Sequence, residues 1–315
     1  MTADELIALR RADWTRLEQL LAKSAANGAD LVELATLYRS ASADTARARA
    51  AGSDAGTLAF LDGLLGRAHN LLYRSPPSKA HAVRNFLVEA FPRTLRRHRR
   101  AFVTASAAFY LPFFFGLFAA WLLPGYGAAV MGHDQLESFR EMYRRAPDDG
   151  RSLGEGTQAV AYYIQHNTSI AFSVFASGIF AGLGSAFMSV YQGLVIGAVF
   201  GFLIGDAKGR NILTFTCGHS AWELTAICIA ATAGIIMGFA IVDTRGRTRM
   251  ASLRAARGDV VTLILGAACM LAVAAGIEGL WSPSALPAPV KWAFAVVQFG
   301  IVGSYLGLAG REVRQ

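Results

Sequence analysis

The feature that most constrains the fold is a run of 49 residues, 157–205, that contains no Asp, Glu, Lys or Arg. A helix of about 20 apolar residues crosses the hydrocarbon core of a bilayer, so this run is too long for one span and suits two. Only 17% of the 315 residues are charged, against about 25% in an average soluble domain. Backbone polar groups in a bilayer must be satisfied within the protein, which favours helices. The sequence therefore predicts an all-α membrane protein.

Four other apolar segments add to these two spans, and the expected total is six. The expected spans are 102–123, about 160–187, about 190–205, 211 or 212 to 242, 260–280 and 290–308. The break inside the charge-free run is placed near Ser189–Gly193. The polar connection Pro124 to Gly156 contains a segment, 133–145, whose Leu136, Phe139 and Tyr143 share one side, as expected of a helix on the membrane surface.

The first third of the chain is typical of a soluble helical domain, so we divide the chain into domains 1–100 and 101–315. Thr2 and Glu5 form a capping-box pattern that starts a helix. Further helices are expected over 30–51 and 55–73, and a fourth segment over 78–91. Leucines recur at helical spacing in the first helices, which predicts a small apolar core.

Arginine clusters beside the apolar spans set the expected orientation. The clusters are Arg93, Arg96, Arg97, Arg99 and Arg100, and then Arg245, Arg247, Arg249, Arg254 and Arg257. Loops rich in Lys and Arg stay in the cytoplasm, and six spans put both termini on that side. The net charge of +8 therefore indicates topology and contact with anionic membrane lipid, and no nucleic-acid partner is expected.

Glycines recur every fourth residue in several spans. The expected helix-packing set is Gly193, Gly197, Gly201, Gly205, Gly234 and Gly238. Without side chains, two helices in lipid approach until their backbones touch, and this contact drives their association. The pattern is compatible with packing inside one chain. It is also compatible with a homodimer seam along the span 190–205.

Five polar residues in three apolar spans form the candidate site. His219 and Glu223 are four residues apart, and such residues share a helix face. The expected topology places His166, Asn167 and Glu278 at a similar depth. A charge inside a membrane costs roughly 2.5–3.5 kcal/mol on insertion scales, so these residues are expected to meet and satisfy one another.

Three interpretations of this polar cluster stay open. The first is a hydrogen-bonded network that fixes how the helices pack. The second is a proton or ion relay along a transport path. The third is a transition-metal site with His166, His219, Glu223 and Glu278 as ligands, because imidazole and carboxylate are usual zinc ligands. No other cofactor is expected, and no nucleophile elbow, phosphate loop or dinucleotide motif occurs in the sequence.

The same residues resemble the stage II sporulation protein M family over roughly residues 90–310. The motifs are His166-Asn167, the glycines 178, 182 and 184, Gln192-Gly193-x3-Gly197, Gly218-His219-x3-Glu223-Leu224 and Gly276-Ile277-Glu278-Gly279-x2-Ser282-Pro283. Leu37-Tyr38-Arg39 and the segment 67–73 are similar to a longer branch of the family, which carries an added N-terminal domain.

The resemblance implies a multi-pass protein of the bacterial cytoplasmic (inner) membrane. It also implies a non-enzymatic scaffold or organiser of an envelope-associated complex, since the namesake acts in a membrane complex with peptidoglycan-degrading partners. The first hypothesis is thus a scaffold whose N-terminal domain recruits a cytoplasmic or envelope protein. The alternatives are a transporter or permease, and an intramembrane metal-dependent hydrolase.

Overall fold

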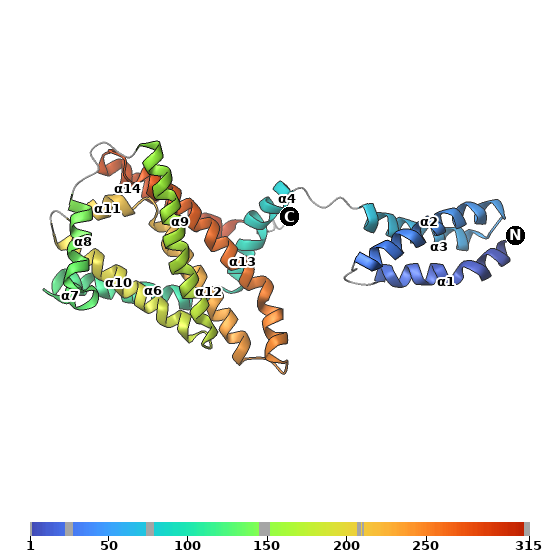
Figure 1. The fold of residues 1–315 in the computed structure, drawn as a ribbon, viewed down its shortest axis with the longest axis horizontal. Helices are drawn as coiled ribbons and strands as arrows, with labels where there is room; N and C mark the ends of the chain where they lie inside the picture. The colour runs from blue at the N-terminus through green and yellow to red at the C-terminus, as the bar shows by residue number, and fades with distance from the viewer. Residues whose placement is uncertain are drawn as a thin grey trace. The chain divides into compact units, whose positions relative to one another are not determined.

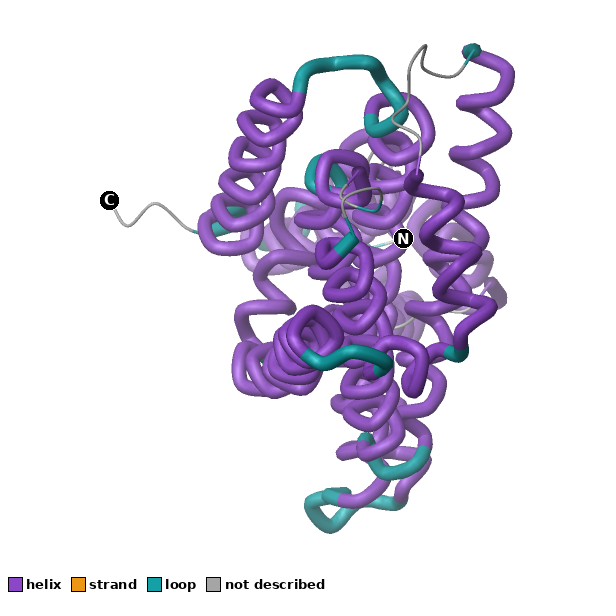
Figure 2. The backbone as a smooth tube through the Cα atoms, turned by 90° about the vertical axis from the view of Figure 1, so that its left-hand side faces the viewer, coloured by secondary structure: helices purple, strands orange, loops and turns teal. Residues whose placement is uncertain are grey.

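The structure, a computed structural model, describes residues 2–22, 28–73, 79–144, 152–206, 209 and 211–311. All regular elements in these ranges are helices, so the all-α expectation is confirmed (Figure 2). The chain divides into two compact units, Met1–Lys79 and Ala80–Gln315 (Figure 1). We call them the N-terminal unit and the membrane unit.

Three helices make up the N-terminal unit: α1 (Ala3–Ala22), α2 (Gly28–Ala50) and α3 (Ala55–Tyr73). They match the expected helices closely. The predicted capping box forms, because the backbone N–H of Thr2 donates to Glu5 and that of Glu5 donates to the Thr2 hydroxyl. Asp54 caps α3, and a hydrogen bond from the Thr57 hydroxyl helps to lower the pKa of its carboxyl group. Buried leucines from all three helices form the core.

A buried carboxylate joins α1 to α2. Asp44 is 0% exposed and accepts hydrogen bonds from Arg10 Nε at 2.8 Å and from Trp14 Nε1 at 3.1 Å. Arg47 Nη1 donates to its other oxygen at 3.0 Å. Buried charges are tolerated when they are paired and hydrogen-bonded, and Asp44 meets both conditions. Asp44 therefore adds directional hydrogen bonds between α1 and α2 to the apolar packing of the leucines.

We expect Asp44→Ala to destabilise the N-terminal unit by about 1–3 kcal/mol, because the buried indole N–H of Trp14 would lose its acceptor and the half-buried Arg10 would lose one of its partners. The matched control is Asp62→Ala, which removes an exposed ion pair with Arg49 and should cost about 0–1 kcal/mol. Urea denaturation of residues 1–79, followed by the fluorescence of Trp14, measures both. Equal losses in the two variants would contradict this role for Asp44.

The membrane unit begins earlier in the chain than the boundary expected at residue 100. Helix α4 (Lys79–Asn85), the π-helical turn η1 (Phe86–Ala90) and α5 (Phe91–Arg97) lead into it. Phe91 packs directly against Gly266, where a Cβ would collide with its ring. The segment after residue 80 therefore packs with the membrane helices rather than with the leucine core of the N-terminal unit.

Six long helices run through the membrane unit in the part of the chain that the structure describes. They are α6 (Arg99–Leu122), α9 (Leu153–Ala176), α10 (Leu183–Gly205), α12 (Ser220–Val242), α13 (Arg249–Gly276) and α14 (Ala288–Leu308). Five of them are long and apolar enough to cross a membrane, α13 being counted with the π-helical turn η3 (Ile277–Trp281) that extends it. Helix α9 is as long as α6 but carries more polar residues.

Helix α9 packs along its length against other helices of the unit. Its first turns contact η3, where Gly156 faces Leu280. The C-terminal end of α9 contacts the C-terminal half of α12, because a Cβ at Gly234 would lie 2.6 Å from the carbonyl oxygen of Phe175. At the ends of the unit, Arg96 Nη1 donates to Leu306 O at 2.7 Å, so α6 starts beside the end of α14.

The break between the second and third spans lies at 177–182 and not near Ser189–Gly193. A short 3-10 turn, η2 (Ser177–Ile179), ends α9, and the turn is completed by Ala181 with φ +57° and Gly182 with φ +80°. A positive φ interrupts a right-handed helix, and Gly adopts it readily. Gly193 instead lies inside α10, so glycine there serves packing and not chain reversal.

Two short helices, α7 (Tyr126–Met131) and α8 (His133–Arg144), occupy the polar connection. The predicted apolar side of α8 is used within the protein. Leu136 is buried, and with Phe139 and Tyr143 it packs against α10 residues Val199 and Leu203. This connection therefore covers one end of α10.

Helices α6 and α10 make the closest long contact in the unit. Added Cβ atoms at Gly193, Gly197 and Gly201 would collide with the carbonyl oxygens of Phe109, Phe113 and Leu117 on α6. Gly205 lies at the edge of this face, where a Cβ would lie 3.7 Å from Trp121. The three inner glycines thus pack against α6 of the same chain.

A second glycine contact joins the α9–α10 turn to α12. Added Cβ atoms at Gly234 and Gly238 would collide with Ser185 Oγ and with Gly182 N, respectively. Ser185 Oγ donates to the Val174 carbonyl at 2.7 Å and so ties α10 to α9 at this point.

We expect Gly197→Ala to destabilise the membrane unit by about 1–3 kcal/mol, because the new methyl group meets backbone atoms that cannot swing aside. Gly303→Ala on α14 is the matched control, since nothing lies within 4 Å of a Cβ there, and it should change stability by less than about 0.5 kcal/mol. Thermal unfolding in detergent compares the two. Wild-type behaviour of both variants would show that α6 and α10 do not pack through this face.

Candidate functional site

Four of the five predicted polar residues lie together in the structure. The potential ligand atoms of His219, Glu223 and Glu278 all lie within 4.8 Å of one another. Asn167 Nδ2 donates to Glu278 Oε2 at 3.3 Å. The side chains come from α9, the start of α12 and η3, so residues more than 100 positions apart meet at one point.

His219 occupies a different local position from the one expected. The expected span 211–242 is two helices, α11 (Asn211–Thr216) and α12, and His219 is the N-cap residue between them. It still lies one turn from Glu223, because the backbone N–H of Glu223 donates to the His219 carbonyl at 3.1 Å. Gly218 permits the break to pack, since a Cβ there would lie 2.6 Å from the Trp281 ring.

Glu278 lies on the π-helical turn η3, which ends α13. A π-turn widens the helix by one residue and is frequent at functional sites. The next residue, Gly279, presses on α9: a Cβ there would lie 2.5 Å from Val160 Cγ2 and 2.9 Å from Val160 N. This close approach brings Glu278, 9% exposed, within reach of Asn167.

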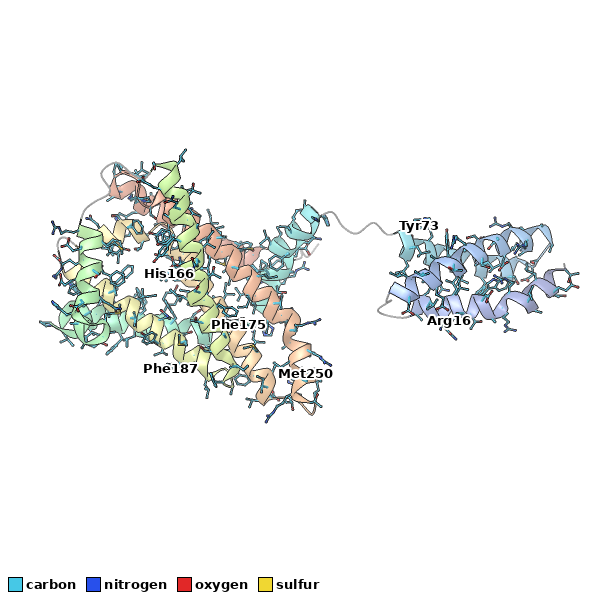
Figure 3. All side chains as sticks on the ribbon, viewed as in Figure 1. Arg16, Tyr73, His166, Phe175, Phe187 and Met250 are labelled. Carbon is cyan, nitrogen blue, oxygen red and sulfur yellow. The ribbon has the colours of Figure 1, made fainter. Side chains whose placement is uncertain are left out.

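His166 is the predicted cluster member that the structure leaves out. It is exposed on α9, and its ring stacks on that of Tyr162 with centroids 5.6 Å apart (labelled in Figure 3). Neighbouring residues on a helix point about 100° apart, so the helix turns Asn167 inward and His166 away. The four-ligand metal set expected from the sequence is therefore reduced to three residues.

Two polar residues that sequence reasoning did not include complete the cluster. Ser282 Oγ lies 3.0 Å from His219 Nδ1, and buried Lys291 donates from Nζ to the Ser282 carbonyl at 2.8 Å. Ser282 could have been predicted from the sequence, because it belongs to one of the family motifs. Lys291 could not, because a single Lys at the start of a span is usually an interfacial anchor.

A further polar contact joins α12 to α14 beside the cluster. Trp222 Nε1 donates to Gln298 Oε1 at 2.7 Å. With the contacts of Asn167 and Ser282, hydrogen bonds now link α9, α12, η3 and α14. The arrangement can hold helices in register, and its imidazole and two carboxylates could also hold a metal ion.

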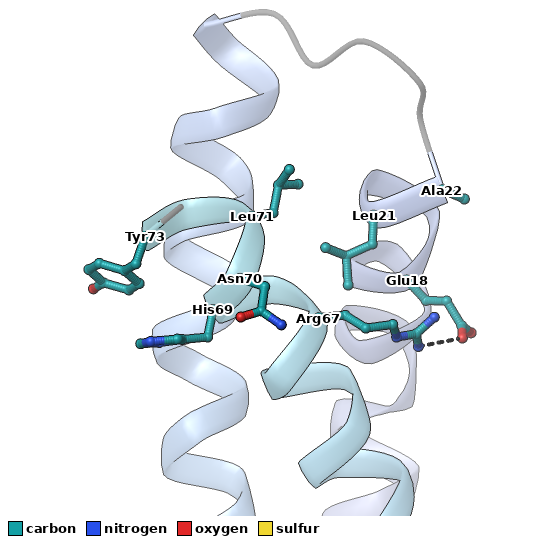
Figure 4. A pocket seen from close by; sticks show the side chains of 8 residues that line it. All are labelled: Glu18, Leu21, Ala22, Arg67, His69, Asn70, Leu71 and Tyr73. Carbon is teal, nitrogen blue, oxygen red and sulfur yellow. Dashed lines mark hydrogen bonds and ion pairs between the residues drawn. The ribbon is translucent and has the colours of Figure 1, made fainter. Parts of the chain in front are cut away.

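The N-terminal unit carries a second candidate site, an open hollow between α1 and α3 (Figure 4). Its lining residues are Glu18, Leu21, Ala22, Arg67, His69, Asn70, Leu71 and Tyr73. Leu21 and Leu71 face the same space from opposite helices, and Arg67 pairs with Glu18 at 3.1 Å at its edge. We call Leu21 and Leu71 the apolar floor of the hollow, and the Glu18–Arg67 pair its charged rim.

Comparison with known proteins places the membrane unit. The model of the family described as Stage II sporulation protein M matches residues 105–283, more than half of the chain. The chain belongs to this family. The resemblance found in the motifs is thereby confirmed, and the matched range of the Stage II sporulation protein M family includes all four residues that meet in the cluster.

The N-terminal unit matches a separate family model. A domain of unknown function matches residues 4–74, which coincide with helices α1 to α3. No curated protein and no solved structure matched this Stage II sporulation protein M family member. The family and the apolar helices together identify a membrane protein.

We expect Gly279→Ala to lower the thermal unfolding temperature, because the added methyl group meets the Val160 backbone and pushes η3 off α9. The matched control, Gly276→Ala, lies one turn earlier, where a Cβ has nothing within 4 Å. Overpacking should cost about 1–3 kcal/mol at Gly279 and little at Gly276. Thermal unfolding in detergent gives the difference, and equal unfolding temperatures would contradict the close contact of η3 with α9.

Proposed function

We propose that this protein is a non-enzymatic scaffold that organises an envelope-associated complex in a bacterial cytoplasmic membrane. The observation that carries the proposal is the pairing of a membrane unit of the Stage II sporulation protein M family with a separate helical unit that has its own core and an open hollow. In this proposal the membrane unit provides the anchor and the N-terminal unit recruits a protein partner.

The buried polar contacts of the membrane unit support an anchoring role. Asn167, Ser282 and Gln298 each bond to a residue on another element. In lipid, hydrogen bonds between helices hold a bundle together, each contributing about 0.6–2 kcal/mol. A rigid bundle is what a platform for other proteins needs. The proposal puts the N-terminal unit in the cytoplasm, because Arg99 and Arg100 stand at the start of α6.

The hollow of the N-terminal unit is the proposed docking site for that partner. Leu71 is 44% and Tyr73 is 65% exposed, so both side chains are accessible to a partner. An apolar floor between two helices suits the apolar face of a partner helix, and its charged rim suits polar residues that flank such a face. The occupant we propose is therefore an amphipathic helix of an envelope protein.

We expect Leu71→Asp in the full-length protein to reduce recovery of its specific membrane partners at least about fivefold, because a charge on the apolar floor opposes docking. The matched control is Leu9→Asp, which changes a 70% exposed leucine of α1 that does not line the hollow. Crosslinking in cells followed by quantitative mass spectrometry compares both with the wild type. Helical content by circular dichroism should stay the same in all three.

Two results would contradict the scaffold proposal. One is that the wild-type protein crosslinks to nothing beyond the background of an unrelated membrane protein. The other is that Leu71→Asp and Leu9→Asp retain the same partners in the same amounts.

The transporter alternative stays a prediction that the contacts do not favour. It requires the polar cluster to face a continuous water-filled path, whereas the hydrogen bonds of Asn167, His219 and Lys291 are made to protein groups. The hypothesis of a metal-dependent hydrolase requires four metal ligands, including His166. His166 lies outside the cluster, so that version of the site does not form.

A further inference from the structure

The His219 and Glu223 side chains of the polar cluster are spaced as two ligands of one metal ion would be. His219 Nε2 and Glu223 Oε2 are 3.7 Å apart. Hydrogen bonds to nitrogen span about 2.7–3.2 Å, so this separation is too long for one. Two ligands that share a tetrahedral zinc ion, with bonds of about 2.0–2.2 Å, lie about 3.4 Å apart. The separation of the two atoms is therefore close to that expected of two ligands of one zinc ion.

The second ring nitrogen of His219 supports the same reading. Nδ1 lies 3.0 Å from Ser282 Oγ, and the Ser282 backbone is held in turn by Lys291. A metal-binding histidine almost always donates its other ring N–H to a nearby oxygen, which fixes the tautomer and the ring orientation. When Nδ1 donates to Ser282, the lone pair of Nε2 is directed at the two carboxylates.

Glu278 is buried and Glu223 is half-buried, and their carboxylates lie close together. Glu278 is 9% exposed and the side chain of Glu223 is 20% exposed, and their ligand atoms lie within 4.8 Å of each other and of His219. Two neighbouring carboxylates repel each other in a low-dielectric interior, and a divalent cation between them removes this repulsion. Asn167, which donates to Glu278 Oε2, orients that carboxylate from α9.

We propose that His219, Glu223 and Glu278 bind one divalent transition-metal ion, with zinc the expected metal. One nitrogen and two carboxylate oxygens suit zinc, iron or manganese, and zinc binds such sites more tightly than the other two. The ion joins the N-terminal end of α12 to the π-turn η3, and Asn167 and Ser282 position its ligands. The site is independent of the proposed scaffold function, because an anchor can be built with or without a metal.

The test is the metal content of the full-length protein, purified in detergent without a polyhistidine tag from cells grown with added Zn²⁺. About one zinc per chain is expected in the wild type. His219→Ala, Glu223→Gln and Glu278→Gln are expected to reduce bound zinc by about 10–100-fold. The matched control is His166→Ala, which removes an exposed histidine one helix position from Asn167 and should keep the full zinc content.

A second measurement separates lost binding from lost folding. Chelator-treated wild-type protein and His166→Ala should gain thermal stability when Zn²⁺ alone is added, whereas Glu278→Gln should gain none, because only native protein with all three ligands binds the ion. Co²⁺ added in place of Zn²⁺ should give the visible absorption of a low-coordinate site. Stoichiometric iron or manganese with the same dependence on the three ligands also supports the site.

Three results would overturn the proposal. The first is wild-type protein that contains no metal and gains no stability with Zn²⁺. The second is zinc that is lost equally from His166→Ala. The third is zinc retained by Glu278→Gln and Glu223→Gln, which would place the metal elsewhere on the chain. A scaffold without a metal would still crosslink to its partners, so the failure of this proposal and the failure of the proposed function are distinguishable.

Discussion

A polar group inside a membrane has to find its partner within the protein, and this constraint organises the membrane unit. His219, Glu278 and Lys291 are all buried, and each has a partner contributed by a distant part of the chain or by the turn at 282. Lipid offers no hydrogen bonds in exchange, so separating these elements leaves polar groups unsatisfied. The apolar surfaces of the helices do not supply this specificity, because lipid solvates them equally well.

Glycine residues let the elements approach closely enough to make these polar contacts. Gly279 lets η3 press on α9, and Gly218 lets the break before α12 pack under Trp281. The same means joins α6 to α10 through Gly193, Gly197 and Gly201. A methyl group would meet backbone atoms at Gly279 and on α10, and the Trp281 ring at Gly218. Close backbone contact thus brings the buried polar side chains within hydrogen-bonding distance of one another.

Much of the fold could be predicted from residue patterns. Capping, breaker and leucine patterns located α1 to α3, and the lengths of the apolar runs indicated six long helices. The position of the break after α9 could not be predicted, because glycine serves both packing and turns. Gly193 packs inside α10, whereas Gly182 forms the turn. The segment 80–97 packs within the membrane unit, and no local pattern indicates this, since the packing of Phe91 on Gly266 is a long-range contact.

For the site, residue patterns alone indicate which polar residues lie in apolar helices and, through the expected direction of the spans, that they share a similar depth. Which of these residues meet depends on how the helices pack. This packing turns Asn167 inward and His166 outward on the same helix, and it brings Ser282 and Lys291 to His219. The reason is geometric. Depth follows from position along a helix, whereas the direction of a side chain follows from how each helix is rotated against its neighbours.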